Sequence, residues 1–378
     1  MPHGPLNLMT DIDGLSIGHA TDLTLGSGVT VILFDEPATA SGTVLGGAPG
    51  GRDVTLLDPS MTVQQVDAFV LSGGSAFGLD AAGGVQSGLR AAGRGFAVGS
   101  VRVPIVPQAI LMDLLNGGAK DWGLHAPYRD LGYQAYHNAA RGAFPLGTVG
   151  AGTGATTANF KGGIGSASAV SSSGHTIAAL VAVNAMGSVV VGDGPHFWAA
   201  PFEEEEEFGG LGQPAHVSAE NRAMRIKGLR LTATTIGTVV TDCALSKAEL
   251  HRLSLSAHDG LARAVLPAHL PLDGDTMFSA STGKRQSNGA ADLMELCHLA
   301  TLVTARAIAR GVYEAVALPY ADALPAWRDR WGRPLLPLGG GESDFDELGE
   351  RKPPKHQKSQ VRGSVRRATI TDPLTGKI

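Results

Sequence analysis

Two short segments of the chain carry residue types that could form a nucleophilic site. Ala233-Thr234-Thr235 opens the β-branched run 236–240, typical of a buried strand, and Asp273-Gly274-Asp275 follows about forty residues later. If the chain is cut before Thr234, the new α-amine can act as the base for that residue's own hydroxyl. Such an amine has a pKa of roughly 7.7–8.0, so part of it is neutral near pH 7. In an extended segment the two aspartates share one face, where both could orient the amine.

Each of these residues also has an ordinary structural interpretation. A threonine at a strand start is common, and Asp273 and Asp275 could simply hold a turn by accepting nearby backbone N–H groups. Asn184 interrupts the apolar run 177–191 and needs a partner if it is buried. It is either a turn residue or a hydrogen-bond donor to an oxyanion.

Composition limits the function classes. The chain has 378 residues, 43% hydrophobic and 17% charged, enough for one large α/β domain or two smaller ones. Its 52 glycines argue against a long helical bundle, and a net charge of −5 gives no case for nucleic-acid binding. The sequence shows neither a signal-peptide pattern nor a run of about 18 apolar residues, so we expect a cytoplasmic protein without a membrane span. Cys243 and Cys297 are expected to be free thiols, with a disulfide as the alternative.

The secondary structure predicted from the pattern is mixed. Strands are expected at 29–34 and 66–72, an extended segment at 98–106, a strand pair at 177–183 and 188–191, and further strands from 234 and at 277–281. Helices are expected at 79–92, at 246–265 with a Ser246–Glu249 capping box, and at 289–313.

Two polar regions are predicted to lie outside this framework. Residues 201–228 include five consecutive glutamates, Glu203 to Glu207, and indicate a solvated loop, with a cation site as the alternative. From Pro319 the character changes, and residues 319–378 are expected to form a flexible or loosely docked tail. Its basic part, 351–367, is either solvated or in contact with an anionic partner.

The glycine motifs and histidines are less specific. Gly73 to Gly78 departs from the G-x-S-x-G pattern at Phe77, which leaves a structural turn or a substrate-lining turn. Gly150 to Gly154 lacks the downstream acidic residue of a dinucleotide site, because 163–173 contains no carboxylate. Four histidines sit at no metal-ligand spacing, so no metal site is expected: His19, His175, His196 and His298.

The order of these motifs resembles one family over residues 10–318: the self-processing N-terminal-nucleophile aminopeptidases. These comprise the L-aminopeptidase/D-amidases, the β-peptidyl aminopeptidases and the nylon-oligomer (6-aminohexanoate-oligomer) hydrolases. The stretches that carry the resemblance are Gly46-Gly47-Ala48-Pro49-Gly50, 71–79 around Gly73-Gly74-Ser75, Gly150-Ala151-Gly152-Thr153-Gly154, Lys161-Gly162-Gly163-Ile164-Gly165 and Asp273-Gly274-Asp275-Thr276.

The resemblance implies an α/β fold, the four-layer α/β/β/α sandwich, built from an α-fragment (1–233) and a β-fragment (234–318) of one precursor. It implies cleavage between Ala233 and Thr234, with Thr234 as nucleophile, Asp273 and Asp275 as its orienting acids, and Asn184 on the oxyanion side. It further implies no metal or organic cofactor, a small peptide or oligoamide substrate, and a homo-oligomer, a homotetramer in the family.

Three positions depart from the family pattern. Ala233 stands where relatives often have Asn or Gly before the nucleophile, and Met112 stands near a family tyrosine. Asn159 falls at the offset of a lysine of the nylon-oligomer enzymes, with Lys161 close by. Lys161, Asn159 and Met112, together with Gly74 and Ser75 of the strand-to-helix turn, are the candidate substrate-binding residues.

Three functions are compatible with these observations. The first is an amide hydrolase that releases N-terminal residues or cleaves small oligoamides. The second is an acyltransferase of the ornithine acetyltransferase type, in which an acyl group on Thr234 passes to an amine instead of water. The third is an uncleaved binding or structural relative, which a persistently intact chain would favour.

Overall fold

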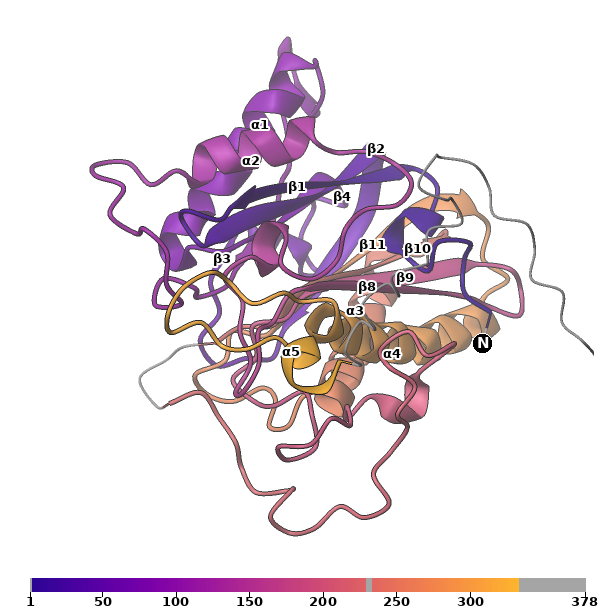
Figure 1. Cartoon of the computed structure of the whole chain (residues 1–378). Helices are drawn as coiled ribbons and strands as arrows, with labels where there is room; N and C mark the ends of the chain where they lie inside the picture. Colours follow the sequence, from indigo (N-terminus) through magenta and orange to yellow (C-terminus); the bar gives the residue numbers. More distant parts are fainter. Residues whose placement is uncertain (1, 229–232, 333–378) are drawn as a thin grey trace, which may run out of the picture. The chain divides into compact units, whose positions relative to one another are not determined.

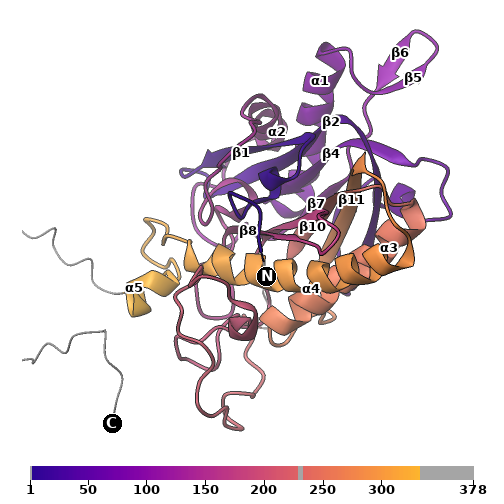
Figure 2. The ribbon, with the colours of Figure 1, turned by 90° about the vertical axis from the view of Figure 1, so that its right-hand side faces the viewer.

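Strands and helices are distributed along residues 2–228 and 233–332, which the structure, a computed structural model, describes. The strands are β1 (Leu15–Asp22), β2 (Ser27–Val44), β3 (Gly51–Arg52), β4 (Gln65–Ser72), β5 (Phe96–Val98), β6 (Val101–Val103), β7 (Gln108–Ile110), β8 (Ile164–Val170), β9 (Thr176–Ala182), β10 (Ile236–Cys243) and β11 (Thr276–Arg285). The α-helices are α1 (Ala81–Ala91), α2 (Tyr128–His137), α3 (Lys247–Ala264), α4 (Ala290–Tyr313) and α5 (Trp327–Trp331). Figures 1 and 2 show α1 and α2 on one side of the strands and α3 and α4 on the other.

The long strand β2 connects two parts of one mixed sheet. The strand order is β3-β7-β4-β2-β11-β10-β9-β8, and β1 pairs with β2 as well. The first half of β2 pairs with β1 and β4, whereas its second half, from Thr39 to Val44, pairs with β11. The register with β4 shifts between Leu33 and Ala38, where β2 can bend. One strand therefore belongs to both β-layers.

Three buried clusters separate four layers, which confirms the predicted α/β/β/α sandwich. One cluster joins α1 and α2 to β1, β2 and β4, and another joins α3 and α4 to β8–β11. The third lies between the two β-layers. Strand β9 shows why, since Ala179 and Val181 face the helices while Ala178 and Leu180 face the other β-layer.

Close packing of α4 explains part of the glycine content. A Cβ at Gly165, in β8, would lie 1.8 Å from the Ala307 carbonyl oxygen of α4. A Cβ at Gly163 would lie 2.5 Å from the Gly311 oxygen. The glycines of the Lys161-Gly162-Gly163-Ile164-Gly165 motif therefore have a structural use, which is to let a helix approach a strand closely.

Most predicted elements are confirmed, but the predicted strand pair at 177–191 is wrong. Strand β9 pairs with β8 and β10, while 188–191 forms only the isolated bridges Ser188–Leu266 and Val190–Phe197. Several strands were not predicted, and one of them, β8, reads Ile-Gly-Ser-Ala-Ser-Ala-Val, whose small residues give little β signal. In the predicted extended segment 98–106, Val98 ends β5 and Val101–Val103 forms β6, and these two short strands pair outside the main sheet.

Two polar regions are more ordered than predicted. Within the predicted solvated loop, residues 211–213 and 222–224 are exposed, but the Glu207 side chain is only 7% exposed and pairs with Arg306 and Arg310. The predicted tail begins too early, because Trp327 is buried among core residues and its indole N–H donates to the Pro195 oxygen. The rest of the tail, 333–378, lies outside the described residues. No helix in the described ranges is long and apolar enough to cross a membrane.

Candidate active site

Three segments distant in sequence meet at one end of β10. Strands β10 and β11 run parallel, so the residues that precede them, Ala233 and Asp273, lie side by side in a parallel bridge. Strand β9 runs antiparallel to β10 and ends at the same place, which brings Asn184 to Thr234. The sheet topology thus brings together the four residues that the sequence singled out as catalytic.

The Ala233–Thr234 peptide bond is buried and held on both sides. The Thr234 N–H donates to the Asn184 backbone oxygen at 3.0 Å. The Ala233 carbonyl oxygen accepts the Gly274 N–H at 3.0 Å and the Thr234 hydroxyl at 2.6 Å. A Cβ at Gly274 would lie 2.8 Å from the Thr234 Oγ1, so glycine is what allows this approach. The hydroxyl is therefore next to the carbonyl that it would have to attack.

The neighbouring Thr235 has a different environment. Its N–H donates to Asp275 Oδ1 at 2.9 Å, but its own hydroxyl is buried without a hydrogen-bond partner among the described residues. Thr234 and Thr235 are thus distinguished by geometry, and Thr234 alone contacts the carbonyl of the preceding residue.

The two aspartates are buried on the same side of the strand ends. Asp273 accepts the N–H groups of Met186 (3.3 Å) and Leu270 (2.9 Å), and Asp275 accepts that of Thr235. Neither carboxylate bonds to Thr234 in this intact chain, within the residues described. Both hold backbone N–H groups near the predicted cleavage position, which is a structural role; their catalytic role stays a prediction.

Sequence reasoning missed a histidine that partners Asp275. His269 lies 2.9 Å from Asp275 through Nδ1, and its backbone N–H reaches the same carboxylate oxygen. Burial works to lower the pKa of His269, but the hydrogen bond and charge of Asp275 outweigh it, and the net pKa is raised. Its position six residues before Asp275 was the one available signal.

Asn184 is fully buried, and its Nδ2, its Oδ1 and its backbone oxygen all form hydrogen bonds. Its Nδ2 donates to the Met112 oxygen at 3.0 Å, and its Oδ1 accepts the Thr156 N–H at 3.0 Å and Lys227 Nζ at 2.8 Å. Its backbone oxygen accepts the Thr234 N–H at 3.0 Å and Lys227 Nζ at 3.2 Å. A second Nδ2 hydrogen remains for an oxyanion, so the predicted role is geometrically open. Lys227, in the polar segment before the predicted cleavage position, was not predicted from the sequence.

The site holds buried charges at a cost. Burial, and then the charge of Asp275, raises the pKa of Asp273 to about 6. Burial lowers the pKa of Lys227 to about 7, against the pull of Asp273, and burial likewise lowers the pKa of Lys161 to about 7. Shifts of this size in opposite directions cluster at functional sites more often than elsewhere.

The predicted substrate-binding residues Lys161, Met112 and Asn159 differ in their contacts. Lys161 is 1% exposed and donates to the Gly152, Ala155 and Gly162 oxygens at 2.7–2.8 Å. Met112 supplies the carbonyl that Asn184 binds. Asn159 lies farther out, bonded to Ser188.

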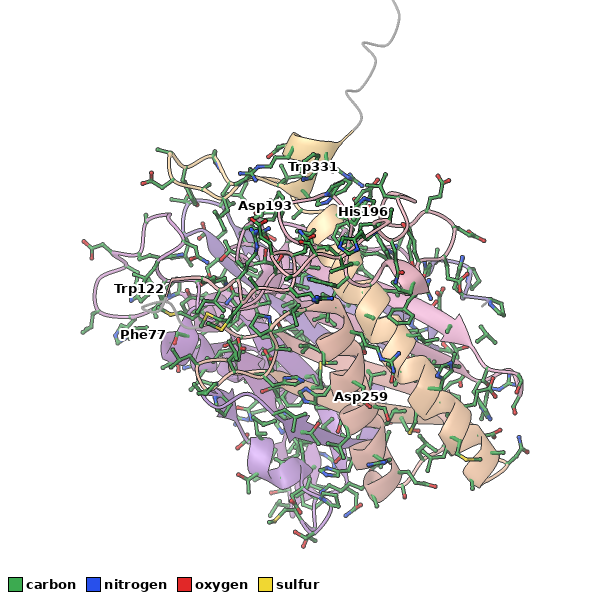
Figure 3. The ribbon with its side chains drawn as sticks, turned by 90° about the horizontal axis from the view of Figure 1, so that it is seen from below. Phe77, Trp122, Asp193, His196, Asp259 and Trp331 are labelled. Carbon is green, nitrogen blue, oxygen red and sulfur yellow. The ribbon has the colours of Figure 1, made fainter. Side chains whose placement is uncertain are left out.

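The strand-to-helix turn at Gly74 and Ser75 packs internally. The Gly74 N–H donates to the buried Asp113, and a Cβ there would lie 2.1 Å from the Tyr128 ring. The exposed Phe77 of the same turn contacts Trp122, and Figure 3 shows the two together at the edge of the molecule. Substrate binding by Gly74 and Ser75 stays a prediction.

A hollow of about 480 Å³ opens next to the site, bounded by 115–117, 156–158, 226–228 and 320–324. Lys227 and Thr156, which both bind Asn184, form its inner wall. A larger hollow of about 800 Å³ lies against α1 and β6 and is lined by Arg52, Arg90 and Arg102, among others, but by none of the predicted site residues. The predicted site residues do not line the smaller hollow either, but Lys227 and Thr156 connect it to Asn184.

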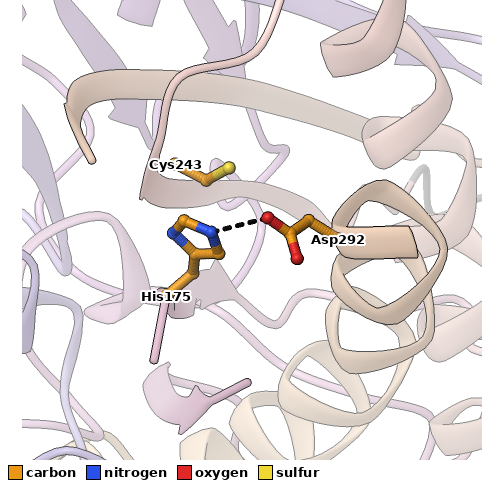
Figure 4. Close-up of side chains that lie close together, drawn as sticks. All are labelled: His175, Cys243 and Asp292. Carbon is orange, nitrogen blue, oxygen red and sulfur yellow. Dashed lines mark hydrogen bonds and ion pairs between the residues drawn. The ribbon is translucent and has the colours of Figure 1, made fainter. Parts of the chain in front are cut away.

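A second buried cluster lies at the other end of β10. Candidate ligand atoms of His175, Cys243 and Asp292 lie within 4.8 Å of one another (Figure 4). Both oxygens of Asp292 already accept protein donors, from Ser173, from His175 at 2.8 Å, and from the backbone and side chain of Asn288. A metal ion would have to displace these bonds, so we assign the cluster a structural role that ties α4 to the turn before β9.

The amino-acid sequence is similar to that of one peptidase family over most of the chain. The family model described as "Peptidase family S58" matches residues 7–323. The chain belongs to peptidase family S58. It is 41% identical to an uncharacterized aminopeptidase of Mycobacterium tuberculosis (strain ATCC 25618 / H37Rv) over 345 residues, 86% of this chain and 98% of the relative. It is 28% identical to the 6-aminohexanoate-oligomer endohydrolase of Agromyces sp. (strain KY5R), over 73% of this chain and 75% of that protein.

Solved structures show the same fold. The L-aminopeptidase D-Ala-esterase/amidase of Ochrobactrum anthropi, titled a variant of the Ntn hydrolase fold, matches with a TM-score of 0.63 and 18% identity over 88% of this chain and 96% of its own. A Burkholderia sp. beta-aminopeptidase matches with a TM-score of 0.60 and 20% identity over 86% and 92%. This S58 peptidase therefore has the Ntn-type fold that its sequence predicted, and it is a hydrolase acting on amide bonds.

Proposed function

We propose that this S58 hydrolase cuts its own chain between Ala233 and Thr234 and then uses Thr234 as an N-terminal nucleophile. The observation that carries the proposal is the contact of the Thr234 hydroxyl with the Ala233 carbonyl, 2.6 Å between oxygens, within a buried group of perturbed charges.

Self-cleavage would begin with attack of the Thr234 Oγ1 on the Ala233 carbonyl carbon. The Gly274 N–H, already on the carbonyl oxygen at 3.0 Å, would stabilise the developing oxyanion. Collapse of the intermediate breaks the C–N bond, moves the acyl group to Oγ1 and frees the Thr234 amine, which takes a proton. Water then hydrolyses the ester and leaves Ala233 as a new C-terminus.

In the mature enzyme the freed amine would accept the Oγ1 proton as the hydroxyl attacks a substrate amide. Asp273 and Asp275 lie just before β11, beside the start of β10, and would orient this amine. The free Nδ2 hydrogen of Asn184 and the Gly274 N–H would receive the oxyanion. The leaving amine takes the proton, and water releases the acyl group from Thr234.

The substrates that fit are small, because the adjoining hollow measures about 480 Å³. We propose peptides with a free amino terminus or short oligoamides such as 6-aminohexanoate oligomers, in line with the names of the two classes of relative. We further propose a homotetramer, as the resemblance implies, and light scattering of the purified protein tests it. From the sequence pattern we propose a location in the cytoplasm.

The deciding experiment is the intact mass of the purified chain, followed by N-terminal sequencing. We expect two fragments, one of which begins at Thr234. A fragment that begins at Thr235 would refute the assignment of Thr234. A chain that stays whole would refute self-cleavage and favour the uncleaved binding relative. A chain cut at Thr234 that hydrolyses no amide, but moves an acetyl group between amines, would identify the acyltransferase instead.

A further inference from the structure

Lys227 has no part in the reaction described so far, yet it lies at the centre of the site. Its side chain is buried, and its Nζ donates to both oxygens of one residue: Asn184 Oδ1 at 2.8 Å and the Asn184 backbone oxygen at 3.2 Å. In the described part of the chain no carboxylate forms an ion pair with it. Its backbone N–H also binds, to the Met186 oxygen at 3.0 Å, so the residue is fixed at both ends.

Each of the two Asn184 oxygens matters for the nucleophile. The backbone oxygen receives the Thr234 N–H, so Lys227 and Thr234 share one acceptor. The side-chain oxygen receives two donors, Lys227 and the Thr156 N–H, which use both of its lone pairs. The amide therefore cannot flip without burying its NH₂ group against two donors, and Nδ2 must face the Met112 oxygen.

The arrangement is costly, which argues against an incidental contact. A buried ammonium bonded to carbonyl oxygens and not to a carboxylate is expensive to desolvate, as the lowered pKa of Lys227 shows. A methionine of similar length would fill the same space without this cost.

We propose that Lys227 is a positioning residue: its ammonium orients Asn184 so that the Thr234 N–H is held and one Nδ2 hydrogen is left for the oxyanion. This rests on the proposed function. It differs from that function in assigning a role to a residue on the N-terminal side of the cut, which neither the Thr234 chemistry nor the acid pair requires.

The hollow beside the site provides a specific test. Lys227 lines its wall, so Lys227→Ala opens a space, reached from the hollow, that a small alkylammonium ion can enter. The matched control is Lys247→Ala. Lys247 is 4% exposed and donates to three backbone oxygens, at 2.7–3.2 Å, on Leu56, Met61 and Val63, and none of these contacts involves the site.

The full chain is made by cell-free translation and its self-cleavage is followed over time by intact mass. We expect Lys227→Ala to slow cleavage about tenfold or more, since a charged hydrogen bond to the Asn184 amide is lost. Propylammonium should restore the rate with saturation, whereas propanol, of similar size but neutral, should not. Lys247→Ala should lower the melting temperature yet cleave at the wild-type rate.

The outcomes distinguish the positioning role of Lys227 from the proposed self-cleavage at Thr234. If the wild type cleaves and Lys227→Ala cleaves equally fast, the positioning role is wrong and the proposed function stands. Equal rescue by propanol would show that Lys227 only fills space, which also overturns the role. If the wild type never cleaves, both fail together. Should the alanine variant not fold, Lys227→Met keeps the volume and is expected to cleave slowly without rescue by either compound.

Discussion

Each end of β10 holds a buried aspartate, Asp292 at one and Asp273 at the other, and the fold shifts the pKa values of these two carboxyl groups in opposite directions. Burial also raises the pKa of Asp242, beside Cys243. At the Cys243 end, Asp292 accepts four hydrogen bonds, and the backbone N–H of Asn288 foremost, then the Ser173 hydroxyl, hold its pKa below the usual range. At the Thr234 end, burial raises the pKa of Asp273 and lowers that of Lys227. Eight residues, roughly 26 Å at about 3.3 Å each, separate the two.

The difference separates structural from chemical clusters. A network whose charges are all matched by donors gains stability from its ionised form. A group of charges whose ionised forms are less favourable in the fold than in water reduces stability, and such strain is retained where chemistry needs groups that titrate near neutral pH. Variants at the two ends should therefore differ in kind: loss of reaction at one, loss of stability at the other.

The largest effect is expected at Thr234. Thr234→Ala removes the attacking hydroxyl, so the chain should remain whole and show no amidase activity, while its melting temperature stays near that of the wild type. Thr234→Ser, which keeps a hydroxyl, should still cleave. The matched control is Thr235→Ala, whose hydroxyl has no described partner and whose loss should leave cleavage within a few-fold of wild type. Cleavage of Thr234→Ala, measured by intact mass, would remove the nucleophile from Thr234.

A smaller loss is expected when the oxyanion donor is removed. Asn184→Asp keeps an oxygen for Lys227 and for the Thr156 N–H but removes the Nδ2 hydrogens. We expect kcat to fall about 10²–10³-fold with little change in KM, for this variant and for Asn184→Ala. If only the alanine variant is impaired, Asn184 acts through its oxygens and the donor role is wrong. Steady-state kinetics on a small amide substrate decides between them.

Asp273→Asn should lose turnover and gain stability. The folded-state pKa of Asp273 is about 6, above its usual value of 3.8, so its ionisation costs stability as pH rises from about 4 to 6. The asparagine variant escapes this cost, on the order of 1–3 kcal/mol above pH 6, and the difference should vanish below about pH 4. Turnover should fall by orders of magnitude, because the amine loses an orienting charge.

The stability comparison is made in the Thr234→Ala background, where no new amine forms. Urea unfolding at pH 4 and pH 8 measures the difference directly. A variant less stable than its parent at pH 8 would mean that the bonds to Met186 and Leu270 outweigh the charge, and that Asp273 is chiefly a turn residue.

The sequence was sufficient to predict the site residues that directly flank regular strands. Thr234 and Asp273 each precede a strand with a clear β-branched or apolar run, and two parallel strands bring their starts together without any further information. Asn184 was visible because a polar residue interrupted an apolar run at the end of a third strand. The family pattern supplied the same residues in the same order.

The residues that were missed reach the site from irregular segments. Lys227 ends a polar stretch that is exposed over much of its length, and only the folded chain shows that its side chain is buried. Two residues earlier in the chain, Arg225 forms an ion pair with Asp193, which Figure 3 labels. His269 lies in the loop after α3. Strand β8 was hidden by its small residues, which are needed because α4 packs against its backbone. Side-chain size there reflects the neighbouring helix and not the strand.

The smallest effect on the reaction is expected at the Cys243 end, and it is the control for the whole comparison. His175→Gln removes an ionisable group from Asp292, and Asp292→Asn leaves the donors of Asn288, Ser173 and His175 without a charged acceptor. Because the folded-state pKa of Asp292 is depressed, its stabilisation is present above about pH 4 and is lost as pH falls below that value. Both variants should have a lower melting temperature at pH 7, and the loss of stability in Asp292→Asn should be smaller at pH 3.

Self-cleavage and kcat should stay at wild-type values in both variants, because the bonds around Thr234 lie at the other end of the strand. Reduced turnover in a variant that is still folded would mean that the two ends are coupled, and a melting temperature raised by zinc in the wild type but not in His175→Gln would make this cluster a metal site after all.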